Sequence, residues 1–545
     1  MSRSSITAGG LGAAQREALD VLFQPFARSD APGLVVGIAR DGRPLYRRAF
    51  GLASVSMGVA NTVTTRVRIG SSAKQFTCLA ALLLAEDGLL DLDAGVRRYL
   101  PMLPELRGEP SLRQLMNHTG GYRCYLDLSF ISDGLALKPA GSALAAQARQ
   151  GDANFAPGEA QLYCNGGYHL LATVVEQVSG QALGELLRRR VFEPLDMRQT
   201  EVVAGDFGLV PGLATLHLAH GEGYCLGAST HEDVVGDGAM VSTADDMLLW
   251  LAHLRSPSKV GRPDSWAQLI EAPRPGGQES QYALGLMRTE YRGVELLHHA
   301  GRVIGGASQV LTVPSLRLDV VILGNTSACA PATLAKRVLD ILGDFTRPVP
   351  AAPSSVDVPG LAGCRYAASD GLVIGFVEQA GALALTVFEN GPLPLRAVQD
   401  GWLLAFEDSA LGPLRVTPMD WRRGEVPARL EVTDGARRFT LERLPADPPA
   451  QPDIRGSYTA PDLLAAAVLT REDGELLLRI HGESGEVALD LRPLASDLLA
   501  WTSRDPLLPL RGVLRVTATG FEIFTPRTRG VLFHRAGPSA RKETS

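Results

Sequence analysis

Residues 68–77 read Arg-Ile-Gly-Ser-Ser-Ala-Lys-Gln-Phe-Thr, and the rest of the chain is organised around this stretch. Ser71 opens a predicted helix over residues 71–86, and Lys74 follows three positions later. Positions i and i+3 share one face of a helix, so the Ser71 hydroxyl and the Lys74 amine can meet. A hydroxyl becomes a nucleophile when a neighbouring base takes its proton, and an unprotonated lysine can be that base. The stretch therefore predicts the S-x-x-K signature of a serine acyl enzyme.

The signature is weak by itself, because Ser256–Lys259 and Ser539–Lys542 match it too. The first of these lies in a proline-containing turn and the second in a polar tail. Only five lysines stand among the 53 basic residues. Arginine is not deprotonated in proteins, so a lysine retained beside an apolar helix favours a base. The alternative is a solvated Lys74 beside an N-capping serine.

Length and charge restrict the classes of protein that this chain can belong to. Its 545 residues exceed one ordinary core, so several domains are expected. The net charge of −6 and the lack of a basic block argue against nucleic-acid binding. The sequence has no run of about eighteen apolar residues, so no membrane span is expected. Residues 1–14 lack the apolar core of a secretory signal.

The six cysteines are scattered and form no C-x-x-C pair. We expect free thiols in a cytoplasmic protein rather than a disulfide or zinc framework. The paired histidines His298 and His299 are not accompanied by an H-E-x-x-H motif or a ligand cluster. The sequence therefore predicts neither a metal nor a cofactor.

Residues 1–345 are predicted to form one α/β sandwich, with helices at both ends and antiparallel strands between them. Asp41-Gly42 joins two strands as a hairpin. The helical patterns cover residues 13–28, 71–86, 112–116, 243–254 and about 332–342. A further helix carries apolar residues from Leu170 to Val178 and is closed by Gly180, and helical patterns continue from there to Val191. The strand patterns cover residues 34–39, 45–50, 296–299, 309–313 and 319–323.

The pattern changes after a proline-rich linker at residues 346–353. From Asp357 onward the sequence shows short alternating strands and no convincing helix, and a second linker at residues 444–449 divides it. Residues 361–366 (Leu-Ala-Gly-Cys-Arg-Tyr) resemble residues 454–458 (Ile-Arg-Gly-Ser-Tyr). We therefore expect two small antiparallel barrels or sandwiches, residues 356–444 and 453–536.

A serine–lysine enzyme needs a second group that moves protons, and Tyr163 in Tyr163-Cys164-Asn165 is the candidate. A nearby lysine ammonium favours the phenolate of a tyrosine. Lys74 and Tyr163 would titrate as one coupled pair, so the base stays unassigned between them. Asn165 can hydrogen-bond Lys74 or a substrate amide. The alternative is a tyrosine that only packs at the start of a helix.

The third element is His299-Ala300-Gly301, at the end of a predicted strand. Gly301 would let a substrate backbone lie flat along that strand. The amide after Gly301 and the Ser71 amide could form an oxyanion hole. H-x-G is common, and residues 118–120 match it as well. The alternative is a neutral histidine in the core or at the strand edge.

Together the three elements resemble the penicillin-recognising serine hydrolases, which include class C β-lactamases, D-Ala-D-Ala carboxypeptidases and related esterases. The resemblance covers about residues 30–345. Within this range, residues 155–158, 191–195 and 236–242 are further matching stretches. It implies an α/β sandwich of β-lactamase type, with Ser71, Lys74 and Tyr163 as catalytic residues and with Asn165, His299 and Gly301 at the substrate.

With its C-terminal half included, the chain resembles the bacterial D-aminopeptidases within that family. That resemblance implies an α/β domain followed by two β-barrels and removal of N-terminal D-residues from small peptides, amides and esters. It also implies inhibition by β-lactams and a homodimer. In that group, an aspartate on a loop of the last barrel restricts the cleft to substrates with a free amine. The matching stretch is Trp501–Arg511, and Asp505 is the matching residue.

The class of substrate stays open between several reactions. Carboxypeptidases and β-lactamases bind a carboxylate of the substrate, for which a fixed cation is useful. A histidine at 299 is mostly neutral at pH 7, which favours an aminopeptidase instead. Arg302, a fixed cation nearby, argues in the opposite direction. The alternatives are an esterase, a D-Ala-D-Ala carboxypeptidase or a β-lactamase on the same scaffold. A fourth alternative is a β-lactam or peptide sensor that is acylated without turnover.

Overall fold

A computed structural model describes residues 10–277, 280–343, 345, 347, 358–379, 381–398, 401–404, 414–422, 424–434, 436–448 and 452–536. The chain divides into two compact units. The first holds residues 1–94, 168–273 and 281–350, and the second holds residues 95–167, 274–280 and 351–545. Residues 1–345, expected as one domain, are thus shared between two units. Of the first predicted linker, residues 346–353, the structure describes Arg347 alone; Thr346 and residues 348–353 lie outside the described residues.

The first unit is built on a six-stranded antiparallel sheet in the order β10-β11-β12-β13-β1-β2. The predicted hairpin is confirmed, with Asp41 and Gly42 at φ of 54° and 73°, as a two-residue hairpin turn requires. The strands are β1 (Leu34–Arg40), β2 (Arg43–Phe50), β10 (Met287–Tyr291), β11 (Val294–Val303), β12 (Gly306–Val313) and β13 (Leu318–Gly324).

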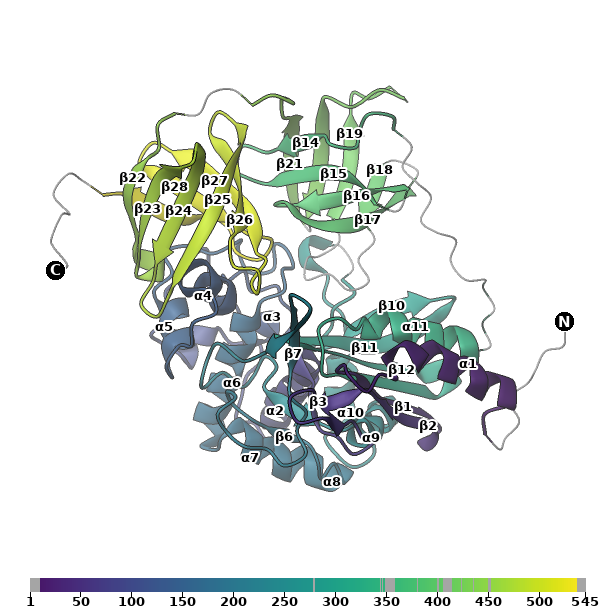
Figure 1. Ribbon diagram of the computed structural model, residues 1–545. Helices are drawn as coiled ribbons and strands as arrows, with labels where there is room; N and C mark the ends of the chain where they lie inside the picture. The colour runs from purple at the N-terminus through teal and green to yellow at the C-terminus, as the bar shows by residue number, and fades with distance from the viewer. Residues whose placement is uncertain are drawn as a thin grey trace. The chain divides into compact units, whose positions relative to one another are not determined.

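Helices cover both faces of this sheet (Figure 1). α1 (Ala13–Phe23) and α11 (Pro331–Leu342) share a core with Leu34, Val36 and Ile38, which alternate along β1. α9 (Ala244–Arg255) packs on the opposite face, where a Cβ at Gly37 would lie 3.0 Å from Leu248 Cδ1. Apolar side chains that recur every second residue in the strands and about every 3.6 residues in the helices therefore pack together in one sandwich.

The helix that follows Ser71 is buried on all sides. α2 runs Lys74–Glu86, and every side chain from Lys74 to Leu84 is buried. The turn before it, Gly70–Ala73, is a 3₁₀ helix (η2), so the predicted single helix over residues 71–86 is two pieces. The other helices of this unit are α7 (Leu183–Leu187), α8 (Glu193–Leu195), α10 (Pro263–Leu269) and the greater part of α6 (Asn165–Ser179).

Short strands and turns complete the first unit. They are β3 (Leu52–Ser54), β4 (Val59–Ala60), β5 (Val67–Arg68), β6 (Glu201–Val202), β7 (His217–His220), β8 (Gly223–Leu226) and β9 (Met240–Ser242), with η1 (Gln24–Phe26), the π-helical turn η4 (Arg188–Phe192) and η6 (Pro314–Leu316).

The second unit contains two closed barrels of eight antiparallel strands, which confirms the predicted β-barrels. The first barrel is β14 (Arg365–Ala367), β15 (Val373–Gln379), β16 (Ala382–Val387), β17 (Asn390–Val398), β18 (Gly401–Leu404), β19 (Leu414–Met419), β20 (Arg429–Asp434) and β21 (Arg437–Arg443). The second is β22 (Gly456–Ala460), β23 (Ala465–Glu472), β24 (Glu475–His481), β25 (Glu486–Ala495), β26 (Leu498–Ser503), β27 (Arg511–Thr517), β28 (Gly520–Phe524) and β29 (Val531–Arg535), with the turn η7 (Pro461–Leu463).

The faint repeat at the start of each barrel has a structural counterpart. Tyr366 on β14 and Tyr458 on β22 are both buried. The Tyr366 hydroxyl donates to the Pro427 carbonyl at 2.7 Å, and the Tyr458 hydroxyl donates to the Ile454 carbonyl. A buried phenol thus keeps its hydrogen bond in both barrels.

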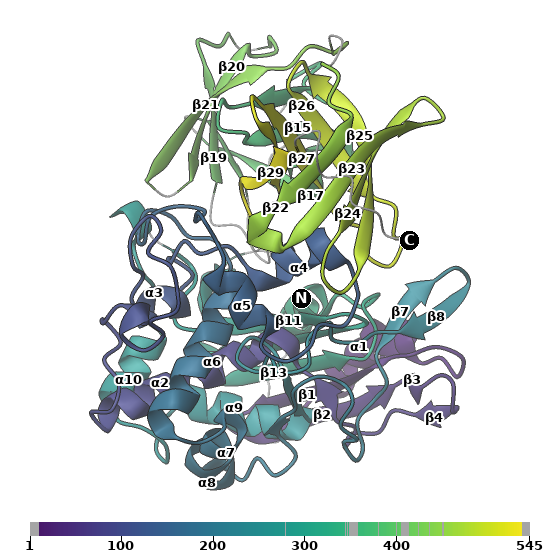
Figure 2. The same ribbon diagram turned by 90° about the vertical axis from the view of Figure 1, so that its left-hand side faces the viewer.

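Residues 95–167 belong with the barrels in the second unit. They contain η3 (Val96–Arg98), α3 (Leu112–Met116), α4 (Tyr125–Asp133) and α5 (Ser142–Ala148). α4 lies against β24 and β25 (Figure 2), and its Leu128 and Ile131 join the core of the second barrel. The sequence pattern predicted α3 with the bounds that the structure shows but gave no prediction of α4 and α5.

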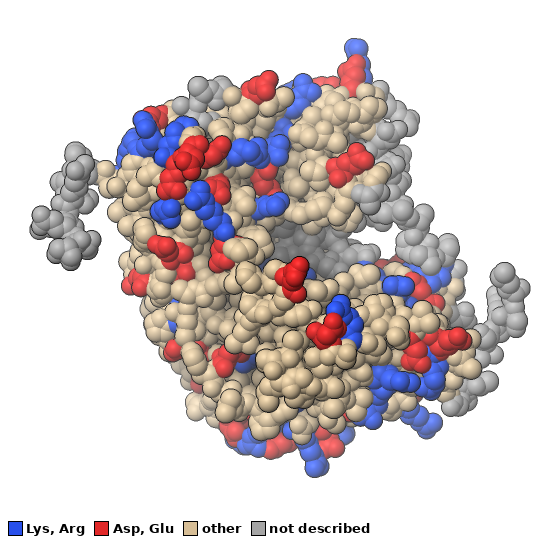
Figure 3. Space-filling model, in the orientation of Figure 1, with Lys and Arg blue, Asp and Glu red and all other residues tan. Residues whose placement is uncertain are grey.

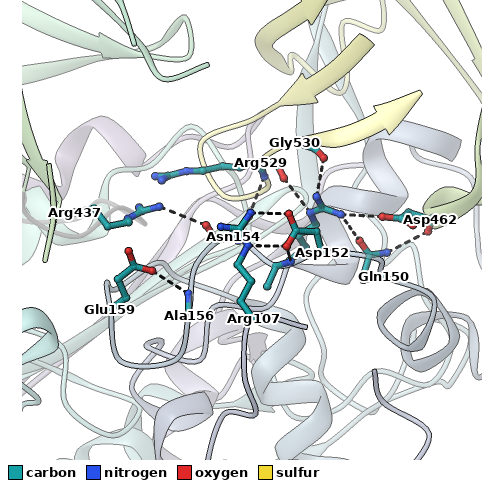
Figure 4. A network of polar contacts seen from close by, with 12 residues as sticks. Arg107, Gln150, Asp152, Asn154, Ala156, Glu159, Arg437, Asp462, Arg529 and Gly530 are labelled. Carbon is teal, nitrogen blue, oxygen red and sulfur yellow. Dashed lines mark hydrogen bonds and ion pairs between the residues drawn. The ribbon is translucent and has the colours of Figure 1, made fainter. Parts of the chain in front are cut away.

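A polar network fixes the β28–β29 turn to this segment (Figure 4). The buried Arg123 guanidinium pairs with Asp462 at 2.9 Å and donates to the carbonyls of Arg529 at 3.0 Å and Gly530 at 2.7 Å. Asn154 accepts from the Arg529 amide at 2.9 Å. Because a buried guanidinium needs such partners, the contacts hold the turn in a defined place.

On the face shown in Figure 3, acidic and basic side chains lie interspersed. In the part of the chain that the structure describes, no helix is long and apolar enough to cross a membrane.

Candidate active site

Ser71 and Lys74 meet at the start of α2. The Lys74 Nζ atom lies 3.1 Å from the Ser71 Oγ atom. Ser71 is partly exposed, whereas Lys74 has an exposed fraction of 0%. In a 3₁₀ turn, residues i and i+3 are eclipsed, so η2 brings the two side chains together as directly as an α-helix would.

Lys74 is held by further groups of the first unit. Its Nζ atom donates to the Asp237 carbonyl and lies 5.2 Å from the centre of the Tyr168 ring. Burying an ammonium group is expensive unless such partners are present. Asp237 lies within residues 236–242, one of the stretches that carried the family resemblance, although the sequence assigned it no role.

Strand β11 passes against the backbone beside Ser71, and glycines make this approach possible. A Cβ at Gly301 would collide with the Ile69 carbonyl oxygen. Gly70 adopts φ of 53°, and a Cβ there would lie 2.8 Å from the Arg302 amide nitrogen. Such positions admit only glycine. The Arg302 amide, which follows Gly301, is therefore close to the turn that carries Ser71.

Two serines fasten this turn to the sheet. The Ser72 hydroxyl donates to the His299 carbonyl at 3.0 Å, and the Ser308 hydroxyl donates to the Ile69 carbonyl at 2.7 Å. The two hydroxyls also lie 3.1 Å apart. Neither Ser72 nor Ser308 was singled out from the sequence, because one serine hydroxyl in a sequence carries no sign of a distant carbonyl partner.

His299 is a neutral, buried residue. Burial is the main cause that lowers the pKa of His299 to about 3, and the charge of Lys74 adds to it. The Nδ1 atom lies 2.5 Å from the Ala300 carbonyl, which can only accept, so Nδ1 carries the proton. The Nε2 atom then accepts from the Tyr282 hydroxyl at 2.9 Å. His299 thus presents no fixed positive charge.

The tyrosine element lies in the second unit, on the segment that leads into α6. The Tyr163 ring lies 4.1 Å from the His118 ring, centroid to centroid. His118 also accepts from the Cys164 amide at 3.1 Å. Asn165 is buried and begins α6. Five residues after Tyr163, the same helix carries Tyr168, whose ring is beside Lys74.

Asp505 occupies a turn before Leu507 in the β26–β27 loop of the second barrel. Its Oδ1 atom accepts from the Leu507 amide at 2.9 Å, and its own amide donates to the Ser503 hydroxyl at 3.2 Å. The carboxylate is partly exposed. These bonds define the shape of the loop, and the role of Asp505 at a substrate stays a prediction.

The rival motif matches lie in different settings. Ser256 caps the end of α9, and Lys259 follows in an exposed bend. Ser539 and Lys542 lie outside the described residues. His118, of the second H-x-G match, contacts Tyr163 instead of a strand.

The six cysteines are all free, as expected. Among the described residues, no group of three or more histidine, cysteine or acidic side chains is placed to hold a metal ion.

Comparison with known proteins places these features in a family. Residues 19–342, more than half of the chain, match the β-lactamase family. A D-aminopeptidase of Cereibacter sphaeroides is 28% identical over 502 residues, which cover 89% of this chain and 90% of that protein. A D-aminopeptidase of Brucella canis is 28% identical over 484 residues, which cover 85% of both proteins.

Solved structures share the fold at low sequence identity. The octameric penicillin-binding protein homologue from Pyrococcus abyssi has a TM-score of 0.54 and 20% identity, covering 78% of this chain and 99% of that one. The D-amino acid amidase from Ochrobactrum anthropi has a TM-score of 0.51 and 21% identity, covering 60% of this chain and 98% of that one. At these identities the likeness concerns the fold.

Proposed function

The chain belongs to the β-lactamase family, and from this premise we propose that it is a serine peptidase that releases N-terminal D-amino acids from small peptides, amides and esters. The observation that carries the chemistry is the 3.1 Å distance between Lys74 Nζ and Ser71 Oγ. A nucleophile and a base within hydrogen-bond reach are the requirement for covalent catalysis by a hydroxyl.

In the proposed mechanism, Ser71 attacks the carbonyl of the first residue while Lys74 and Tyr163 accept its proton as a coupled pair. The C–N bond then breaks, and Tyr163 returns a proton to the departing amine. Water hydrolyses the ester on Ser71 and releases the D-amino acid. Tyr163 enters this proposal as the second proton-handling group that a serine–lysine enzyme needs.

We assign the oxyanion hole to two backbone amides, those of Ser71 and Arg302. The support for this choice is the close approach of Arg302 to Gly70, which only glycine permits. Amides that are already oriented stabilise the charge of a tetrahedral intermediate without reorganisation. In the same proposal, Gly301 lines the substrate backbone, and Asn165 hydrogen-bonds Lys74 or the substrate amide.

The choice of substrate draws on the relatives and on His299. The D-aminopeptidases that match this chain are similar over both its α/β part and its barrels. A neutral His299 does not offer a cation for a substrate carboxylate, which fits an enzyme that reads an amine instead. In this proposal, the Asp505 carboxylate binds the free α-ammonium group of the substrate.

The test is turnover of D-alanine p-nitroanilide by the purified full-length protein and by Ser71→Ala. We expect the wild type to cleave it and the variant to lose several orders of magnitude in rate. Equal rates would refute the mechanism. A parallel panel of L-alanine p-nitroanilide, D-Ala-D-Ala, nitrocefin and a short ester separates this activity from the carboxypeptidase, β-lactamase and esterase alternatives.

For Asp505, the test is an N-acetylated D-alanine p-nitroanilide. We expect the wild type to reject it, and Asp505→Asn to lose much of its preference for the free amine. A wild type that hydrolyses both substrates equally well would show that Asp505 does not read the amine. A long-lived acyl adduct, detected by mass spectrometry without turnover, would instead favour the sensor.

Three expectations belong to this proposal as predictions: a homodimer and inhibition by β-lactams, which the family resemblance implies, and a cytoplasmic location, which the scattered cysteines favour. Light scattering of the purified protein tests the first. Loss of p-nitroanilide turnover after incubation with a penicillin tests the second, and fractionation of the native host tests the third.

A further inference from the structure

A chain of hydrogen bonds runs through the core of the first unit and ends at His299. Besides that histidine it contains Cys78 on α2, Tyr168 on α6 and Tyr282, which lies shortly before β10. All four side chains are buried. Buried polar groups that are hydrogen-bonded to one another make a core rigid, and the mechanism above gives no task to the thiol or to the two phenols.

The direction of each hydrogen bond follows from the number of protons available. His299 carries its proton on Nδ1, which donates to the Ala300 carbonyl, so its Nε2 atom accepts from the Tyr282 hydroxyl at 2.9 Å. That bond uses the one hydroxyl proton of Tyr282. In the hydrogen bond between Tyr282 and Tyr168, the Tyr168 hydroxyl is therefore the donor.

The first member of the chain is a thiol. The Cys78 Sγ atom lies 3.3 Å from the Tyr168 hydroxyl oxygen. Burial raises the pKa of Cys78 to about 12, so the thiol keeps its proton and can donate it to that oxygen. The chain thus points one way, from α2 through α6 to β11.

Both ends of the chain lie beside groups that the proposed mechanism uses. The centre of the Tyr168 ring is 5.2 Å from the Lys74 Nζ atom. At the other end, the His299 carbonyl accepts from the Ser72 hydroxyl at 3.0 Å, in the turn that carries the nucleophile. Three positions after this histidine, β11 carries Arg302, whose amide is assigned to the oxyanion hole. The chain therefore connects the surroundings of the buried amine with the strand of the oxyanion donor.

We propose that Tyr282 is a positioning residue, which fixes the ring of His299 through a hydroxyl group that Tyr168 holds in place. The fixed ring keeps its part of β11, and with it the Arg302 amide, in the orientation that the oxyanion requires. This inference rests on the proposed function and adds a residue to it. Hydrogen bonds that point one way strengthen each other, so the ring is held more firmly than one isolated bond would hold it.

The same arrangement keeps His299 without charge. Burial is the largest cause that lowers the pKa of His299, and the charges of Lys74 and His298 add to it. The Tyr282 hydroxyl binds the unprotonated Nε2 atom and so favours the neutral ring as well. A neutral ring that is held on both sides offers no cation to a substrate carboxylate, which agrees with an enzyme that reads an amine.

The first test locates the proton on His299 by ¹⁵N NMR of the full-length protein with labelled histidine at neutral pH. We expect the proton on Nδ1, and the signal is identified by its absence in His299→Asn. A wild-type ring that carries its proton on Nε2 would overturn the inference, because the Tyr282 hydroxyl would have no acceptor there. This measurement needs neither turnover nor a substitution at Tyr282.

The second test is Tyr282→Phe, which removes the hydroxyl group and keeps the ring. We expect kcat for D-alanine p-nitroanilide to fall about tenfold, the effect of one neutral hydrogen bond, while KM changes less than about twofold. The loss should appear in kcat because the oxyanion forms only during the reaction. The Nδ1 proton of His299 should also exchange with solvent faster, since the ring is held from one side only. A folded variant with the wild-type kcat would overturn the inference.

The matched control is Tyr291→Phe, on β10 of the same sheet. The buried Tyr291 hydroxyl donates to the Asp340 carboxylate at 3.0 Å, so this variant also loses the hydrogen bond of a buried phenol. We expect a lower denaturation midpoint, with kcat and the NMR signal of His299 as in the wild type. If both variants lower kcat equally, a general loss of stability explains the effect and the inference is wrong.

A double-mutant cycle tests whether Tyr282 acts through His299. In His299→Asn, which lacks the Nε2 acceptor, adding Tyr282→Phe should lower kcat by less than about twofold. A further tenfold loss in that background would overturn the inference. If the wild type cleaves D-alanine p-nitroanilide and Tyr282→Phe is equally fast, the inference fails and the proposed function stands. If no D-aminoacyl substrate is cleaved, the proposed function fails, and the NMR measurements alone decide whether Tyr282 fixes His299.

Discussion

The Lys74 Nζ atom lies 3.1 Å from the Ser71 Oγ atom and also donates to the Asp237 carbonyl, so one buried amine joins the turn before α2 to the segment before β9. Ser71 is partly exposed, whereas Lys74 is completely buried. The hydroxyl is therefore accessible to solvent and the amine is not, which supports the proposed roles of Ser71 as nucleophile and Lys74 as base.

Replacing Lys74 by methionine should reduce kcat/KM for D-alanine p-nitroanilide by about 10²- to 10⁴-fold, the range for losing a general base. Methionine keeps an unbranched apolar side chain in the buried site, so the fold should persist. Circular dichroism and thermal unfolding check the fold, and steady-state kinetics check the rate. More than a tenth of the wild-type rate in a folded variant would exclude Lys74 as the base.

Replacing Gly301 by alanine should abolish most activity and lower the free energy of unfolding by about 1–3 kcal/mol. The new Cβ would collide with the Ile69 carbonyl oxygen and push β11 away from the Ser71 turn. The matched control is Gly208→Ala, where a Cβ meets nothing within 4 Å. Urea denaturation and turnover measure both effects. Equal behaviour of the two variants would show that the close approach has no role.

Replacing Arg123 by glutamine should destabilise the second unit by about 3 kcal/mol or more. The guanidinium group is buried, and its loss leaves Asp462 and the carbonyls of Arg529 and Gly530 without their donor. Arg107→Gln is the control in the same network (Figure 4), since the Arg107–Asp152 pair is exposed and should contribute at most about 1 kcal/mol. Similar denaturation midpoints for both variants would contradict this account.

The stability of the first unit should fall as the pH is lowered from about 6.5 toward 4. Burial is the first cause that lowers the pKa of His298 to about 4 and of His299 to about 3, from an ordinary value of 6.5. Between these values the unfolded chain binds more protons than the folded one, so acid favours unfolding, and the contribution is complete above pH 6.5. Denaturant midpoints measured from pH 7 to pH 4 test this.

The control for that pH dependence is His299→Asn, which keeps a donor for the Ala300 carbonyl and cannot take up a proton. Its stability should fall less steeply with pH than that of the wild type. A variant with an unchanged slope would show that His299 does not contribute.

Much of the fold was predictable from local pattern. The hairpin at Asp41, the bounds of α3 and the strands β11, β12 and β13 follow from the period of apolar residues and from turn residues. α4 was missed because polar residues interrupt its pattern. Asp127 and Ser132 are buried in it, and Asp127 finds its partner Arg527 about 400 positions later in the chain.

The candidate site was predictable only in part. The spacing of Ser71 and Lys74 is a local property, because residues three apart eclipse in a 3₁₀ turn. Tyr163 and His299 were chosen as partners that a serine–lysine enzyme needs, and Asp505 was chosen by resemblance to a family. Their catalytic and binding roles remain predictions. Gly70, Ser72 and Ser308 gave no local signal, since their partners are backbone atoms of distant segments.

The amino-acid sequence by itself determined the S-x-x-K pair, the α/β part followed by β-barrels and the family, because spacing and periodicity act between near neighbours. Only the tertiary structure decided that Lys74 reaches the Asp237 carbonyl, that β11 touches the Ser71 turn through Gly301 and that Arg527 pairs with Asp127. These contacts depend on packing between segments hundreds of residues apart, and such packing leaves no periodic trace in the chain.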